Sequence, residues 1–360
     1  MIASDAKNTG DGASGPGPAV AEGPLDWAAE APYFQAGLAG YSDAAMRLIA
    51  RRHGSPYCIT EAMLDQFLIN GGKGLQAAEL DEEDHPIAGQ LMGSHPEDIA
   101  AGAKILVELG YDVVDINLAC PVKKIKKKCR GGHLLSSPGE AIDILRAVRD
   151  AVGGREGGGV PLTVKLRRAY DESEVSEAAF YQIFEAAIDL GYSGATVHAR
   201  TVEQKYLGPS RWPFLAELTQ RYRDEMTRGF RIFGSGDIFT PESIFEMVKT
   251  TGVQAASVAR GCIGNPWIFR QAQQLMRGEV ATPPTLMEQR EVLLEHFQLS
   301  VDLHGESQAG RMMRKFGIKF SVHHPDGDAV KNAFIRVKNL SDWRAALDAF
   351  YPQTDVQGVT

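Results

Sequence analysis

The sequence predicts an α/β protein, a (β/α)8 barrel followed by a small helical bundle. Two observations support this prediction. Between residues 33 and 263, eight short apolar, β-branched runs alternate with segments of helical period, whereas residues 284 to 350 show helical period alone. Strict alternation predicts a parallel sheet with right-handed crossovers, and eight strands are enough to close it into a barrel. A doubly wound open sheet is the alternative architecture.

The eight predicted strands lie at residues 33–40, 56–63, 86–93, 113–120, 161–167, 194–200, 230–238 and 255–263. Helical segments separate them. In residues 137–152, for example, Ser137 can cap a helix whose first turn contains Pro138. The first 30 residues are rich in Gly, Ala, Pro and acidic residues, which is typical of disorder. We therefore expect a disordered tail over 1–30, a barrel over 31–280, a helical domain over 281–351 and a tail over 352–360.

Composition limits the functional classes. The chain has 360 residues, 44% of them hydrophobic, and can bury a large core. Its net charge of -8 argues against coating nucleic acid everywhere, so a polyanion would need a local patch. No apolar run is long enough to cross a bilayer, and no secretory signal is evident. The four scattered cysteines (Cys58, Cys120, Cys129 and Cys262) predict neither a disulfide framework nor a metal site. We expect a cytoplasmic monomer without a metal or a membrane partner.

Polar residues and glycines gather where the predicted strands end. In a barrel of this kind the active site lies at the carboxyl ends of the strands. Turn chemistry would explain any one of these positions, but so many together predict a lined cavity. The residues concerned are Gly37 to Gly40, Gln90, Asn117, Cys120, Lys165, His198, Arg200, the GSGD of 234–237 and the ARG of 259–261.

The last two strand ends predict a phosphate site. The glycines of GSGD let backbone N–H groups approach an anion, and Arg260 adds a cation before a helix start expected near Gly264. The loops after strands seven and eight are the usual phosphate site of this barrel. Lys165 and Gln90 would then face the ring of a phosphorylated cofactor such as a flavin.

Two basic segments predict contact with a nucleic-acid backbone. The first follows Cys120 at the rim of the predicted cavity, and the second repeats a cation every four residues, so its cations share one helix face. Met312, Phe316 and Phe320 form an adjacent stripe that is expected to pack in the bundle. A solvated face is the simpler explanation of any such charge run. The cations are Lys123, Lys124, Lys126, Lys127, Lys128 and Arg130 in the first segment, and Arg311, Lys315 and Lys319 in the second.

Residues 33 to 350 resemble the tRNA-dihydrouridine synthases, in particular their bacterial B-type branch. The resemblance rests on AGLAGYSD (36–43), QLMGSHPE (90–97), DINLACPVKK (115–124), VKLR (164–167), VHARTVEQKY (197–206), GSGDI (234–238) and ARGCIGNPWIF (259–269), in the family's order and spacing. It implies a barrel that holds FMN and a C-terminal helical domain that binds tRNA. The implied reaction reduces a flipped uridine to 5,6-dihydrouridine, with NADPH reducing the flavin and hydride passing from the flavin to uracil.

The resemblance also implies residue roles. Cys120 matches the proton donor, a task that suits a thiol with an unperturbed pKa of about 8.5. A buried structural cysteine is the alternative. The implied FMN contacts are Gly37, Leu38, Ala39, Gln90, Lys165, His198, Ser235, Gly236, Asp237, Ala259 and Arg260. The expected RNA contacts are Asn117 at the uracil edge, Arg200, Lys123, Lys126, Lys127, Lys128, Arg311, Lys315 and Lys319.

The sequence departs from the family pattern at two kinds of position. Small residues replace the usual ones at Gly37, Ala119, Ser235 and Ala259, so FMN binding should persist. In CRGGHLL (129–135), however, a thiol, an arginine and a histidine occupy a loop where the family has small residues. Two other functions therefore stay open. One is an FMN-dependent dihydropyrimidine or dihydroorotate oxidoreductase, which would need no basic rim, and the other is a catalytically impaired tRNA-binding flavoprotein.

Overall fold

The predicted barrel is confirmed. The computed structural model describes residues 25–122, 130–153 and 159–352. Its parallel strands run in the ring order β1, β2, β4, β5, β6, β7, β8, β9, and the ring closes because β1 pairs with β9 while β2 pairs with both β1 and β4. A further short strand, β3, pairs with the end of β4. The strands are β1 (Tyr33–Gln35), β2 (Cys58–Ile59), β3 (Met63–Leu64), β4 (Ile87–Met92), β5 (Val113–Leu118), β6 (Leu162–Arg167), β7 (Gly194–His198), β8 (Arg231–Ser235) and β9 (Ala255–Val258).

Several strands are shorter than expected at their carboxyl ends. The first ends at Gln35 rather than at residue 40, because the following loop turns at Gly40, whose φ of 75° is outside the extended region. The predicted strand over 56–63 is divided between β2 in the ring and β3 beside β4. The residues beyond the shortened ends form loops, and these loops carry most of the predicted site.

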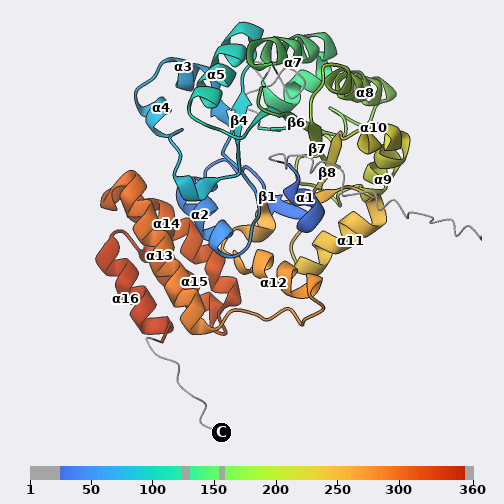
Figure 1. Cartoon of the computed structure of the whole chain (residues 1–360). Coiled ribbons are helices and arrows are strands. Elements are labelled where there is room, and N and C mark those ends of the chain that lie inside the picture. Colours follow the sequence, from blue (N-terminus) through green and yellow to red (C-terminus); the bar gives the residue numbers. More distant parts are fainter. Residues whose placement is uncertain (1–24, 123–129, 154–158, 353–360) are drawn as a thin grey trace, which may run out of the picture.

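Helices surround the ring (Figure 1). Those of the barrel are α1 (Trp27–Glu30), α2 (Ala44–Arg52), α3 (Asp65–Ile69), α4 (Lys73–Gln76), α5 (Pro96–Glu108), α7 (Pro138–Val152), α8 (Glu174–Asp189), α9 (Trp212–Arg221), α10 (Arg223–Thr227), α11 (Pro241–Thr251) and α12 (Trp267–Met276). Ser137 does occupy the N-cap of α7 with Pro138 at its first turn, but its side chain makes no capping hydrogen bond, contrary to prediction. The helix expected near Gly264 begins only at Trp267, after a 3-10 turn over Arg260–Cys262.

The helical domain forms a bundle on one side of the barrel, next to α2 and α12 (Figure 1). It comprises α13 (Leu286–His304), α14 (Glu306–Phe320), α15 (Gly327–Arg336) and α16 (Leu340–Phe350). Phe316 and Phe320 are buried as predicted, but Met313 is buried in place of Met312, which is half-buried. Edge-to-face packing joins the domains, because the ring of Phe320 lies 5.5 Å from that of Trp267.

Residues 25–30, the last six of the disordered tail predicted over 1–30, instead pack against the barrel. Leu25 and Ala28 are buried, and Trp27 stacks on Tyr57 at 4.9 Å and on Phe233 at 5.6 Å. These contacts form because the segment contributes apolar and aromatic side chains to a second core cluster with strand residues. Residues 1–24 and 353–360 lie outside the described part of the chain. Within the described part, no helix is long and apolar enough to cross a membrane.

Candidate active site at the carboxyl ends of the strands

Strand register aligns the predicted site residues. Paired residues of adjacent parallel strands project to the same side of a sheet. Arg167 of β6 pairs with His198 of β7, His198 with Ser235 of β8, and Ser235 with Ser257 of β9. One row of side chains therefore crosses four strands near their carboxyl ends. Asn117 and Lys165 are likewise paired on β5 and β6.

Four buried side chains from β4, β5 and β6 form a continuous hydrogen-bond chain, which we call the relay. Thr163 Oγ1 donates to one oxygen of Asp115 at 2.6 Å, and Gln90 Nε2 donates to the other at 2.7 Å. Gln90 Oε1 in turn accepts from Asn117 Nδ2 at 2.6 Å. Asn117 Oδ1 accepts from the backbone N–H groups of Ala119 and Cys120, both at 3.0 Å. The relay thus joins the barrel interior to the loop that carries Cys120.

Lys165 is a partly buried cation above the relay. Burial lowers the pKa of its ammonium group to about 8, although the negative charge of Asp115 opposes this shift. The pKa of Asp115 is itself raised by burial, against the hydrogen bonds from Thr163 and Gln90 that favour its charged form. Lys165 is therefore largely cationic at neutral pH but loses its charge when the pH rises slightly above neutral.

Cys120 is partly exposed at the start of the loop after β5. Burial raises the pKa of its thiol, while a backbone hydrogen bond from Val122 and the positive charge of Arg167 act the other way. Arg167 also donates from Nε to Ala119 O at 2.8 Å, and Gly132 N–H donates to Cys120 O at 3.0 Å. The loop is held from both sides, and its thiol stays protonated at neutral pH.

Asn117 differs from expectation in its surroundings. The prediction places its amide at the uracil edge, yet both ends of the amide are engaged within the relay. Its side chain is 7% exposed. Its observed contacts are those of a residue that shapes the Cys120 loop, and the uracil contact stays a prediction.

The loops after β8 and β9 provide close backbone approach and unpaired polar atoms. Gly236 has a φ of 122°, and a Cβ there would lie 2.2 Å from Ser210 Oγ. A Cβ on Gly261 would lie 2.2 Å from Ile238 O. The buried hydroxyls of Ser210, Ser235 and Ser257 have no hydrogen-bond partner among the described residues. Orphaned hydroxyls beside a glycine turn are what an anionic ligand would satisfy.

Arg200, which is buried, and Asp237, which is half-buried, form an ion pair across these loops. Arg200 Nη2 lies 2.6 Å from Asp237 Oδ2, and its Nε donates to Gly208 O at 3.0 Å. Asp237 also accepts from Ser210 N–H at 2.8 Å and lies 3.4 Å from Arg260 Nη2. Arg200 was expected to contact substrate or flavin, but its observed contacts hold the 208–210 loop against Asp237.

Arg260 is an exposed cation in the turn after β9. Its guanidinium lies 4.9 Å from the centre of the Tyr206 ring and 5.1 Å from that of Phe239. Both aromatic side chains are exposed at this mouth. Sequence reasoning did not single out either ring, although Tyr206 ends a recognised motif. Ala259, just before Arg260, has φ -103° and ψ -98°, so the backbone turns sharply here.

His198 lies between the two groups of side chains. Its Nδ1 accepts from Arg200 N–H at 3.2 Å, so the neutral ring carries its proton on Nε2. Burial, reinforced by the charges of Arg167 and Lys165, lowers the pKa of His198 well below its usual value. The ring is therefore a neutral hydrogen-bond donor toward the cavity.

The loop after β1 lies close to the relay. A Cβ on Gly37 would lie 2.2 Å from Thr60 O and 3.4 Å from Gln90 Oε1, so a glycine is required for this approach. Leu38 N–H is held by Ser42 Oγ at 2.7 Å, and Ala39 is exposed. This loop is the expected place for one edge of a flat cofactor.

The basic segments divide into three groups. Lys123, Lys124, Lys126, Lys127 and Lys128 lie outside the described residues. Arg130 is buried, 3.6 Å from Asp65 Oδ1, so it belongs to the scaffold rather than to a basic rim. On α14, Arg311 and Lys319 are exposed as expected, whereas Lys315 is half-buried, donates to Gly40 O and lies 4.6 Å from the Tyr41 ring centre. Lys315 therefore joins the helical domain to the first barrel loop.

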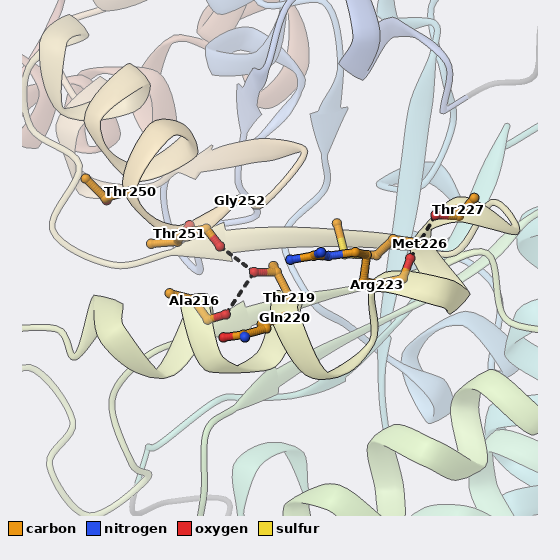
Figure 2. A pocket seen from close by; sticks show the side chains of 9 residues that line it. All are labelled: Ala216, Thr219, Gln220, Arg223, Met226, Thr227, Thr250, Thr251 and Gly252. Atoms are coloured by element: carbon orange, nitrogen blue, oxygen red, sulfur yellow. Dashed lines mark hydrogen bonds between the residues drawn. The ribbon is translucent and has the colours of Figure 1, made fainter.

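A separate hollow of about 640 Å³ lies away from these residues (Figure 2). Its walls are the carboxyl-terminal parts of α9 and α11 together with α10, and Thr219 Oγ1 donates across it to Thr251 O. Because these helix ends precede β8 and β9, the hollow is at the opposite end of the barrel from Cys120. Among the described residues, no cluster of His, Cys, Asp or Glu has the arrangement of a metal site.

Comparison with known proteins gives one consistent result. The family model described as dihydrouridine synthase matches residues 34–354. A probable tRNA-dihydrouridine synthase of Treponema pallidum is 33% identical over 80% of this chain and 84% of its own length. A tRNA-dihydrouridine synthase B of Shewanella oneidensis is 32% identical over 77% of this chain and 82% of its own. A Pseudomonas aeruginosa protein of the same name is 30% identical over 89% and 93%.

Among solved structures, a histamine dehydrogenase from Rhizobium sp. 4-9 has a TM-score of 0.51 and 14% identity. The match covers 72% of this chain and 48% of that one, so the chain spans about half of the larger protein. At this identity the likeness concerns the barrel fold alone.

Proposed function

Because the chain belongs to the dihydrouridine synthase family, we propose that it reduces specific uridines of tRNA to 5,6-dihydrouridine, with FMN as its flavin and NADPH as the reductant. The observation that carries this proposal is the position of Cys120. A protonated, partly exposed thiol follows β5, next to the strand that carries the cation Lys165, and the residues suited to a phosphate follow β8 and β9 further round the ring.

The residues present fit FMN. Gly236 and Gly261 allow the loops after β8 and β9 to pack closely against Ser210 and Ile238, and Ser235 and Ser257 offer hydroxyls without partners among the described residues. Arg260 adds a positive charge at the same mouth, which suits a phosphate. Lys165 would hold the polar edge of the ring, and Gln90, whose amide is already engaged at both ends in the relay, would add only the second hydrogen of its NH2 group. When bound, the reduced flavin supplies the hydride for the C5=C6 bond of uracil.

The protein supplies the proton and the orientation. Addition of hydride to one carbon of the double bond requires a proton at the other, and the Cys120 thiol is protonated at neutral pH because burial raises its pKa. His198, neutral and donating from Nε2, would hold a carbonyl oxygen of the ring system or of the base. A base that undergoes this chemistry must leave its stack to reach the Cys120 thiol, which is partly exposed.

The impaired-flavoprotein alternative loses its main support. It rested on Cys129, Arg130 and His133 in the loop where the family has small residues, and Cys129 lies outside the described residues. Arg130 points to Asp65, and His133 packs beside Tyr170 with a ring nitrogen 3.3 Å from Val122 O. Both side chains are buried in the scaffold rather than projecting into the entrance.

The test compares substrates with a single enzyme preparation. Purified protein loaded with FMN and NADPH is given unmodified tRNA, free uridine, uracil or orotate, and product is measured by mass spectrometry. If the proposal is correct, dihydrouridine forms in the tRNA, and free uridine, uracil and orotate are not reduced. Turnover of a free pyrimidine without tRNA activity would favour the small-molecule oxidoreductase, and FMN binding without any turnover would favour the impaired flavoprotein.

A further inference from the structure

The relay has a fixed polarity. At the end of the relay next to Cys120, the backbone N–H groups of Ala119 and Cys120 can only donate. Asn117 must therefore present Oδ1 to them. Asn117 then has only its NH2 group for Gln90, which must answer with Oε1. Gln90 is left with its own NH2 group, which needs an acceptor deeper in the barrel. Asp115 is that acceptor at 2.7 Å.

Burial makes these contacts costly to lose. Asp115 is 0% exposed and Gln90 is 1% exposed, so water cannot replace a missing partner. A buried donor or acceptor left unsatisfied costs more than an average hydrogen bond contributes. If Asp115 loses its acceptor oxygens, the NH2 group of Gln90 is buried without a partner. The Gln90 side chain is then no longer fixed in the orientation that presents Oε1 to Asn117, and the hold of Asn117 on the loop would weaken.

We infer that Asp115 is a positioning residue for Cys120, acting through Gln90 and Asn117, and that Thr163 supports it by donating to its second oxygen. Asp115 does not itself touch the cavity occupant. Its role is to orient the two amides, so that the turn over Ala119 and Cys120 is held in one conformation. The inference rests on the proposed function for the meaning of that conformation, since Cys120 is the proposed proton donor.

The experiment measures loop position without tRNA or NADPH. Iodoacetamide alkylation of Cys120 is followed by peptide mass spectrometry, which separates it from Cys129. Cys58 on β2 is fully buried in the same barrel and reports general loosening in the same sample. Asp115→Leu removes both acceptor oxygens. Asp115→Asn keeps an acceptor for Gln90, because Thr163 can turn its hydroxyl to accept from the new amide.

In Asp115→Leu, Cys120 alkylation should rise about tenfold while Cys58 stays protected, since one buried donor has lost its partner and the loop is freed. Dihydrouridine kcat should fall by a similar factor with KM for tRNA little changed. Asp115→Asn should remain within about twofold of the parent in both measurements. Unchanged Cys120 alkylation in Asp115→Leu, or a rise shared by Cys58, would overturn the inference.

A milder pair covers the case in which Asp115→Leu does not fold. Thr163→Val removes one donor to Asp115, and Thr163→Ser restores it. Thr196→Val, the same change on the next strand, is the matched control. Thr163→Val alone should raise Cys120 alkylation, by about twofold to fivefold; a rise of the same size in Thr196→Val would contradict the inference. If alkylation responds as expected but Cys120→Ala keeps normal turnover, the positioning role stands and the proton-donor role fails.

Discussion

The two halves of the candidate site differ in how their buried polar groups are satisfied. On β4, β5 and β6, the polar groups of the relay satisfy one another inside the protein. On β8 and β9, the hydroxyls of Ser235 and Ser257 are equally buried but have no partner among the described residues. The first side is therefore pre-organised before any ligand arrives, whereas the second has the unpartnered hydroxyls that the proposed cofactor would satisfy. This division suits an enzyme that holds a reactive thiol rigidly and binds a phosphorylated cofactor beside it.

The largest expected effect tests the pre-organised side. Cys120→Ala should lower dihydrouridine formation by about 10²- to 10⁴-fold, because it removes the proposed general acid. NADPH-dependent flavin reduction should continue at the parent rate, since that half-reaction needs no proton from Cys120. Stopped-flow absorbance and product mass spectrometry measure the two separately. Cys262→Ala is the matched control, because Cys262 is a buried cysteine behind the other side of the cavity.

The second prediction tests whether tRNA binding depends on residues outside both halves of the candidate site. Neutralising Lys126, Lys127 and Lys128 together should weaken tRNA binding about tenfold or more at moderate salt, because each lost phosphate contact reduces the slope of log affinity against log salt by about 0.7 to 0.9. FMN content should not change. Lys315→Met should have a different effect: this residue contacts Gly40 and Tyr41, so the salt slope should stay while the junction of the two domains loosens. Binding titrations at several salt concentrations decide both points.

Sequence reasoning reached the fold and gathered the candidate site residues at the strand ends, because strand alternation and strand-end chemistry are local properties. It did not reach the partners of individual side chains. Arg200 and Asp237 are 37 positions apart, and only the β7 and β8 loops bring them together. Asp115 and Thr163 look like ordinary strand residues until register places them side by side. Trp27 was assigned to a tail because composition does not reveal that aromatic residues of the strands form a core cluster against which it packs.

The third prediction concerns Lys165, whose pKa is lowered to about 8 by burial. The affinity of the apoprotein for FMN should fall several-fold as pH rises through about 8, since the ring edge then loses its cation. Lys165→Met should remove this dependence. The free energy of unfolding should change in the opposite direction. Below about pH 8 the buried charged amine destabilises the folded state, and this destabilisation is lost as pH rises from about 8 to the ordinary pKa near 10.5. Over that pH range the parent should therefore become more stable relative to Lys165→Met.

Fluorescence titration of FMN and chemical denaturation at several pH values measure the two trends. Lys104→Met, on the exposed part of α5, is the control and should leave the FMN trend intact. A parent affinity that is flat from pH 7 to 9.5 would mean that Lys165 does not face the flavin.

The smallest expected effect tests the side completed by ligand. Ser257→Ala should weaken FMN binding by about twofold to fivefold, because one neutral hydrogen bond to the cofactor is lost. The apoprotein should be no less stable, because an unpaired buried hydroxyl has been removed. Ser193 offers a matched control: its hydroxyl is also buried without a partner among the described residues, but it lies before β7, at the amino end of the barrel. Ser193→Ala should therefore leave FMN affinity unchanged. If the two variants lose FMN equally, or neither does, then orphaned hydroxyls do not mark the cofactor side, and the contrast between the two halves of the cavity has another origin.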